Sequence, residues 1–149
     1  MNRDWPKKMY DLALEVATWS KDPKRQVGAV IFRGKNNVVA VGYNGIPRAL
    51  EDKTDRLEGD AKYQWIEHAE RNAIYMASQS GINLDDCSMA ATLFPCVECV
   101  RAILQCGIAH LITAKPDFSD HKWGEQYFIS VEMLEEAGTK ITYVEPNLV

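Results

Sequence analysis

Two short segments carry the residue types of metal chemistry, H-A-E at residues 68–70 and P-C-V-E-C at residues 95–99. A C-x-x-C pair at the start of a helix turns both sulfurs to one side, where free N–H groups and the helix dipole favour thiolates. Together with the imidazole of His68, Cys96 and Cys99 make three protein ligands. Three ligands that leave the fourth position open are typical of a catalytic zinc site.

Two other interpretations of the same residues stay open. A structural zinc site uses four ligands, and a fourth is available from Cys87, Cys106, His110 or His121, although none of them forms a second close pair. A redox dithiol is the other alternative, but it has no need of the H-x-E segment. The spacing favours catalytic zinc, with Cys87 and Cys106 as buried thiols.

Glu70 follows His68 by two residues, close enough to reach a water molecule at the metal without binding the metal itself. Two thiolates neutralise the charge of zinc, so a carboxylate base is needed to take the proton of that water. In a dry pocket the pKa of Glu70 rises, which lets it pass the proton onward. The alternative is a solvated side chain on a helix surface.

These segments must be positioned by a framework of alternating helices and strands. Helical periodicity and caps predict helices over residues 5–20, 65–78, 97–106 and 126–137, and apolar runs predict strands over 27–32, 38–43, 88–94, 110–114 and 140–144. Residues 45–63 are polar and predict a surface loop that holds at most a short helix. This order predicts one α/β domain over residues 1–149, a three-layer αβα sandwich on a mixed five-stranded sheet.

Composition narrows the class of protein further. The chain has 149 residues, of which 46% are hydrophobic and 26% charged, an ordinary globular composition without an apolar run long enough to span a membrane. The absence of a secretory leader predicts a cytoplasmic protein. A net charge of −4 argues against binding of long nucleic acid, whereas residues 1–50 carry nine Lys or Arg and only four acids. That basic third can hold one small anion.

Four motifs resemble those of the deoxycytidylate (dCMP) deaminases, including compact viral ones, and the resemblance spans residues 8–145. They are SKDPKRQVGAVI, GYNGIP, HAERNAI, and TLFPCVEC followed by ILQCGI. H-x-E with P-C-x-x-C is the signature of zinc nucleobase deaminases. The resemblance implies the cytidine-deaminase-like fold, hydrolysis of dCMP to dUMP and ammonia, and one zinc per subunit on His68, Cys96 and Cys99. Glu70 then moves protons between water, N3 of cytosine and the leaving amine.

Substrate contacts are expected from several segments. The resemblance implies that Asn44 grips the substrate, although Asn44 also suits a tight turn before glycine. Ala69, inside the H-A-E segment, is assigned to the same pocket. Arg25 is the first candidate for the 5′-phosphate. The other candidates are Lys21, Lys24 and Arg48 for the phosphate, and Phe118 or Tyr127 for packing on the base, with plain core or loop packing as the alternative for both aromatic residues.

Regulation is implied by the resemblance alone. The family is typically a homohexamer that dCTP activates and dTTP inhibits, with an effector site around Tyr43, Asn44, Gly45, Ile46 and Pro47. Acidic residues within 51–62 can hold the Mg²⁺ of a triphosphate.

Two alternative functions stay open. One is another deaminase of this fold, acting on nucleosides, free bases or tRNA adenosine. The other is a non-catalytic zinc-stabilised binding module, against which the intact Glu70 argues.

Overall fold

A computed structural model describes residues 4–145, and its secondary structure follows the predicted order. The helices are α1 (Trp5–Ala17), α2 (Lys62–Trp65), α3 (Ala69–Gln79), α4 (Val97–Gln105) and α5 (Gly124–Glu136), with 3-10 turns η1 (Thr54–Leu57) and η2 (Gly59–Ala61). The strands are β1 (Gly28–Arg33), β2 (Asn37–Tyr43), β3 (Ser88–Ala91), β4 (His110–Thr113) and β5 (Lys140–Tyr143). None of these helices is long and apolar enough to cross a bilayer.

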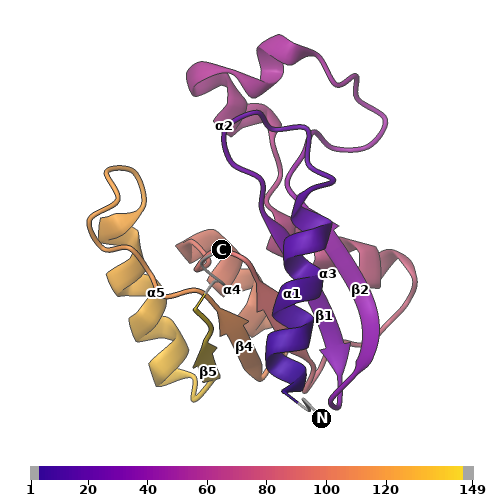
Figure 1. The fold of residues 1–149 in the computed structure, drawn as a ribbon, viewed down its shortest axis with the longest axis vertical. Helices are drawn as coiled ribbons and strands as arrows, with labels where there is room; N and C mark the ends of the chain where they lie inside the picture. The colour runs from indigo at the N-terminus through magenta and orange to yellow at the C-terminus, as the bar shows by residue number, and fades with distance from the viewer. Residues whose placement is uncertain (1–3, 146–149) are drawn as a thin grey trace.

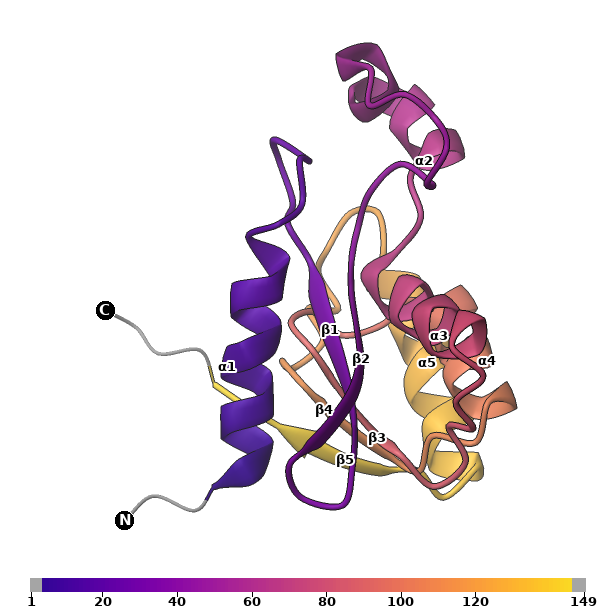
Figure 2. The same ribbon diagram turned by 90° about the vertical axis from the view of Figure 1, so that its right-hand side faces the viewer.

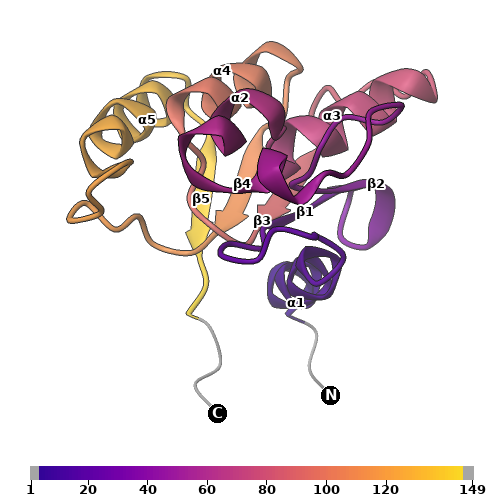
Figure 3. The ribbon, with the colours of Figure 1, turned by 90° about the horizontal axis from the view of Figure 1, so that it is seen from above.

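The strands form one mixed sheet in the order β2-β1-β3-β4-β5. Strand β1 is antiparallel to both β2 and β3, while β3, β4 and β5 run parallel to one another. Helix α1 covers one face of the sheet, and α3, α4 and α5 cover the other (Figures 1, 2 and 3). The predicted three-layer αβα sandwich on a mixed five-stranded sheet is therefore confirmed.

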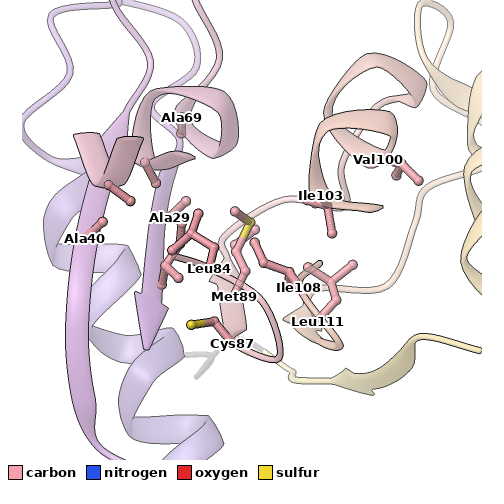
Figure 4. Close-up of a cluster of buried hydrophobic side chains, with 14 of the residues drawn as sticks. Ala29, Ala40, Ala69, Leu84, Cys87, Met89, Val100, Ile103, Ile108 and Leu111 are labelled. Atoms are coloured by element: carbon pink, nitrogen blue, oxygen red, sulfur yellow. The ribbon is translucent and has the colours of Figure 1, made fainter. Parts of the chain in front are cut away.

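Alternation along the central strands divides the core between the two faces. Ile31 and Met89 belong to the cluster under α3, α4 and α5, whereas Val30 and Ile112 belong to the cluster under α1. Figure 4 shows the first cluster, in which Met89 gathers with aliphatic side chains from the neighbouring helix and strand. Neighbouring strand residues point to opposite faces, so a short strand buried on both sides supplies both clusters.

Two glycines let helices lie directly on the sheet backbone. A Cβ at Gly42 in β2 would collide with the backbone of Ala69 and Ala73 in α3. A Cβ at Gly28 in β1 would collide with the backbone of Ala13 and Ala17 in α1. The close contact at Gly42 fixes the first turn of α3, and therefore the H-A-E segment, against strand β2.

The helix predicted over residues 65–78 is wrong at its start. Helix α3 begins at Ala69, and His68 is extended at its N-cap position. The backbone N–H of Glu67 donates to the carbonyl of Gly45 at 2.8 Å, and the N–H of Gly45 donates back to Glu67 at 3.1 Å. This bridge holds the chain extended, so the helix begins only after it. The other predicted helices and strands match with ends that differ by up to three residues.

The candidate metal centre and active site

The three predicted metal ligands meet where α3 and α4 begin. Nδ1 of His68 lies 3.5 Å from Sγ of Cys96 and 3.4 Å from Sγ of Cys99, and all three donor atoms lie within 4.8 Å of one another. A tetrahedral zinc with ordinary Zn–N and Zn–S bonds separates its nitrogen and sulfur ligands by about 3.6 Å. The donor set and its spacing therefore fit zinc, and His68, Cys96 and Cys99 form a zinc-binding site.

The candidate fourth ligands lie elsewhere. Within residues 4–145, the cluster able to hold a metal contains only the three residues above, and it excludes Cys87, Cys106, His110 and His121. His110 instead bonds Thr142 across the sheet, with Nε2 and Oγ1 2.8 Å apart. Three protein ligands leave one coordination position for water or substrate, as in catalytic rather than structural zinc sites.

The surroundings of Cys96 favour a thiolate, the form that binds a metal cation. Hydrogen bonds from Cys99 and His68 hold the pKa of the Cys96 thiol at about 4, although burial opposes this shift. Cys96 is the N-cap residue of α4, where the helix dipole also favours a thiolate. The hydrogen bond with Cys96 and burial raise the pKa of the Cys99 thiol.

Arg71 ties the two ligand-bearing helices together. Its Nε donates to Oε1 of Glu67 at 2.7 Å, and its Nη1 donates to Oε2 of Glu98 in α4 at 2.8 Å. The same Glu67 oxygen accepts the backbone N–H of His68 at 2.9 Å. This network fixes His68 relative to the cysteines. The i,i+4 spacing of Glu67 and Arg71 is a sequence signal for it that the sequence analysis missed.

Glu70 is buried in the first turn of α3, with 4% of its surface exposed. Burial raises the pKa of its carboxyl group above the ordinary value, although the charge of His68 opposes the shift. Glu70 lines the same cavity as His68 and Cys96. A buried carboxyl group with a raised pKa beside a metal centre is suited to accept a proton and to release it again.

A cavity of about 320 Å³ opens over these groups, and loops distant in the sequence build its walls. It brings the predicted residues Arg25, Asn44 and Ala69 together with His68 and Glu70. The remaining lining residues are Asp22, Lys24, Val27, Lys62, Tyr63, Ile66, Leu93, Phe94, Cys96, Asp120, Lys122, Trp123 and Tyr127.

Of the two aromatic candidates, the structure brings only Tyr127 to the cavity. Tyr127 is buried, and burial raises its pKa to about 12, so its hydroxyl stays protonated. Phe118 lies outside the lining and stacks on Phe128 with ring centroids 4.3 Å apart. Both rings are exposed, and the partner of Phe118 is Phe128 rather than the cavity wall.

The other aromatic residues of the wall were not predicted from the sequence. The Trp123 ring stands edge-on to the imidazole of His68 at 5.9 Å, and Tyr63 stands edge-on to Trp123 at 6.3 Å. The ammonium group of Lys122 lies 3.4 Å from the centroid of the Tyr63 ring. Trp123, an apolar residue within a polar loop, is a sequence signal that could have indicated this wall.

Asn44 has both a cavity position and a structural role. Its Oδ1 accepts the backbone N–H of Val27 at 2.9 Å, and its Nδ2 donates to the carbonyl of Arg25 at 2.8 Å. These bonds fasten the end of β2 to the loop before β1, which carries Arg25. The tight turn expected at Asn44 is wrong, because within residues 4–145 the non-glycine residues with positive φ are Ala49 and Asp86. Asn44 instead bonds across to the neighbouring loop while it lines the cavity.

A second cavity of about 530 Å³ lies beside the first. Its lining includes the whole predicted effector segment, Tyr43, Asn44, Gly45, Ile46 and Pro47. Of the other basic candidates, Lys21 and Arg48 line this second cavity, whereas Lys24 lines the first. Among the acids within 51–62, Asp52 lines it and pairs with Lys21 at 2.6 Å.

Comparisons with known proteins agree with this geometry. The family model for the cytidine and deoxycytidylate deaminase zinc-binding region matches residues 3–115. An uncharacterised deaminase from the luxG 3′ region of Aliivibrio fischeri is 39% identical over 142 residues, which cover 94% of this chain and 93% of that protein. The deoxycytidylate deaminase of Homo sapiens is 37% identical over 123 residues, covering 78% and 68%.

A solved structure has the same fold. The dCMP deaminase of cyanophage S-TIM5, crystallised in complex with dCMP and dUMP, matches with a TM-score of 0.76. The match covers 97% of this chain and 99% of that chain at 19% sequence identity, a level at which the likeness concerns the fold.

Proposed function

The chain belongs to the cytidine and deoxycytidylate deaminase family, and we propose that this zinc-dependent deaminase hydrolyses dCMP to dUMP and ammonia. The observation that carries the proposal is the buried carboxyl group of Glu70 beside three metal ligands, in a cavity whose wall also holds Arg25, Lys24 and Lys122. Because the helices pack on a single sheet, we also propose that residues 1–149 act as one domain.

The chemistry divides between the metal and Glu70. When bound, zinc supplies a Lewis acid that lowers the pKa of a water molecule in the open position. Glu70 takes the proton of that water and delivers it to N3 of cytosine, while the water oxygen attacks C4. Glu70 then takes the second proton from the hydroxyl group now on C4 and passes it to the amine. The C4–N bond breaks as the C4=O bond forms, so water and dCMP yield dUMP and ammonia. We propose one catalytic zinc per subunit.

The cavity wall suits a pyrimidine that carries a phosphate. Trp123 and Tyr127 offer apolar surface for the base next to His68 and Glu70. Within residues 4–145, the ammonium groups of Lys24 and Lys122 form no ion pair, and Arg25 contacts Asp120 only at 3.4 Å. We assign the 5′-phosphate to Arg25, with these lysines as its neighbours, and Asn44 and Ala69 to the substrate wall.

The second cavity supports regulation by deoxynucleoside triphosphates, with dCTP as activator and dTTP as inhibitor. It lies around Tyr43–Pro47 and holds two basic residues, Lys21 and Arg48, for a polyphosphate. Asp52 is the acid placed to share a Mg²⁺ with that polyphosphate. Exposed apolar side chains on α3 and α5, such as Tyr75 and Phe128, support assembly into a homo-oligomer, for which we propose a hexamer.

The test is ammonia release from the zinc-loaded protein with dCMP, CMP, deoxycytidine, cytosine and adenosine-containing RNA. We expect dCMP to be the preferred substrate, with one ammonia for each dUMP formed. Preference for a nucleoside, a free base or RNA would assign the chain to another activity of the family. Zinc binding without ammonia from any substrate would make it a binding module.

A further inference from the structure

A buried ion pair stands in the wall of the catalytic cavity. Nζ of Lys62 lies 2.7 Å from Oδ2 of Asp22, and the two side chains are 11% and 0% exposed. Both residues line the cavity. Figure 1 shows the two segments that the pair joins, α2 and the loop after α1, side by side above the sheet.

The Asp22 carboxylate also builds the loop that carries Lys24 and Arg25. Its Oδ1 accepts the backbone N–H groups of Lys24 at 2.9 Å and Arg25 at 3.3 Å. Hydrogen bonds from Lys62 and from these backbone groups lower the pKa of Asp22, although burial opposes the shift. Asp22 is therefore a charged carboxylate hydrogen-bonded to the backbone of Lys24 and Arg25, in the loop assigned to the substrate phosphate.

Such a carboxylate creates a problem for a site that binds a phosphate dianion. Like charges repel strongly where burial reduces screening, and a buried charge must be paired. Within residues 4–145, the cation that forms an ion pair with Asp22 is Lys62. The other basic residues of the wall lie elsewhere: Arg25 pairs with Asp120, and Lys122 lies over the Tyr63 ring.

We infer that Lys62 determines the preference for a nucleotide over a nucleoside, because it neutralises Asp22 and so lets the loop of Lys24 and Arg25 accept a 5′-phosphate. This inference rests on the proposed function. In this role Lys62 is a specificity residue that acts through Asp22, and it makes no bond to the phosphate itself. A lysine that acts through Asp22 and a lysine that binds the phosphate directly respond differently to a second substitution at Asp22.

The experiment compares kcat/KM for dCMP and for deoxycytidine in three variants, Lys62→Met, Asp22→Asn and the double variant. Lys62→Met leaves the carboxylate unpaired, so the dCMP-to-deoxycytidine ratio should fall by at least about tenfold, mainly through KM for dCMP. Asp22→Asn should not lower the ratio. The double variant removes both charges, so it should restore the ratio to within about threefold of wild type.

Lys7→Met is the matched control, because it removes an ion pair of another lysine, Lys7 with Asp11 on α1, away from both cavities. It should leave the ratio unchanged. Zinc content and the thermal midpoint of each variant report folding. If Lys62→Met does not fold, the double variant carries the test, since a neutral pair must keep the wild-type ratio.

A ratio that Lys62→Met leaves unchanged would overturn the inference. A ratio that stays low in the double variant would overturn it as well, since it would show a direct bond between Lys62 and phosphate. A wild-type enzyme without preference for dCMP would contradict the proposed function instead, so the two failures are distinguishable.

Discussion

Nδ2 of Asn44 lies 3.4 Å from Oδ2 of Asp22, and these two side chains line both cavities of the molecule. The wall between the cavity over the three metal ligands and the second cavity is therefore a hydrogen-bonded unit. Ser20 extends it, because its Oγ donates to the carbonyl of Asn44 at 2.8 Å and accepts the N–H of Asp22 at 3.2 Å. We expect a ligand that shifts this wall from one cavity to change the other cavity as well.

We expect coupling between nucleotide binding in the second cavity and dCMP turnover in the first, visible in steady-state kinetics. The rate should depend sigmoidally on dCMP concentration, dCTP should make the dependence hyperbolic, and dTTP should suppress turnover. Coupling of this kind typically changes affinity by about 5–150-fold. Arg48→Gln, in the second cavity, should abolish both responses, whereas Lys53→Met, outside both cavities, should retain them. Hyperbolic kinetics that ignore both nucleotides, from a monomer in sedimentation, would refute the regulatory proposal.

Zinc content should follow the three ligands. Elemental analysis of the wild-type protein should find one zinc per chain, and Cys99→Ala should lose nearly all of it, because two protein ligands hold zinc poorly. Cys106→Ala is the matched control, since that thiol donates to the carbonyl of Ile103, lies outside the metal-ligand cluster of residues 4–145, and should leave the zinc content unchanged. Two tightly held zincs in the wild type, or full zinc in Cys99→Ala, would contradict this site.

The phosphate assignment predicts a selective effect of Arg25→Gln. Removing a cation that faces a dianion should raise KM for dCMP by about tenfold or more, since charge-assisted hydrogen bonds to phosphate are among the strong ones. Steady-state kinetics with deoxycytidine should be nearly unchanged. Arg33→Gln, at the far end of β1, removes a cation outside the cavity and should have no effect on either substrate. Equal losses for both substrates would remove Arg25 from the phosphate site.

The packing of α3 on the sheet predicts the effect of Gly42→Ala. The new Cβ meets the backbone of Ala69 and Ala73, which no side-chain rotation can relieve. The free energy of unfolding should fall by about 1–3 kcal/mol, the usual cost of overpacking. Val38→Ala, at an exposed position of the same strand, should lower it less. Denaturant titration checks both, and an unchanged midpoint for Gly42→Ala would contradict the close helix–sheet contact.

Sequence patterns predicted the metal centre because its ligands are local. His68 precedes Glu70 by two residues and Cys96 precedes Cys99 by three, and the helical patterns that follow these residues place both groups near the start of a helix. Helical periodicity and short apolar runs likewise predicted the helices and strands, and their order along the chain predicted the layers of the sandwich. The predicted start of α3 was wrong, because the backbone hydrogen bonds between Glu67 and Gly45 hold the chain extended where the periodicity is helical.

The cavity wall could not be predicted in this way. Asp22 and Trp123 lie in loops and Lys62 begins the single turn of α2, and only the folded chain brings these three segments together. Phe118 is the opposite case, a residue that was predicted for the cavity but lies outside its lining. An aromatic residue in a loop near the active site looks like a base contact, but its partner is Phe128.

Isotope transfer from water tests most directly whether the chain hydrolyses dCMP with Glu70 as the proton carrier. In water enriched in oxygen-18, the zinc-loaded protein should convert dCMP to dUMP that carries the heavy oxygen at C4, detected by mass spectrometry, with one ammonia per product. Glu70→Gln should retain zinc and slow this reaction by at least about 10²-fold, the low end for general acid–base catalysis, while Glu132→Gln on the exposed side of α5 should not. Unlabelled dUMP, no dUMP at all, or near-normal turnover by Glu70→Gln would contradict the claim.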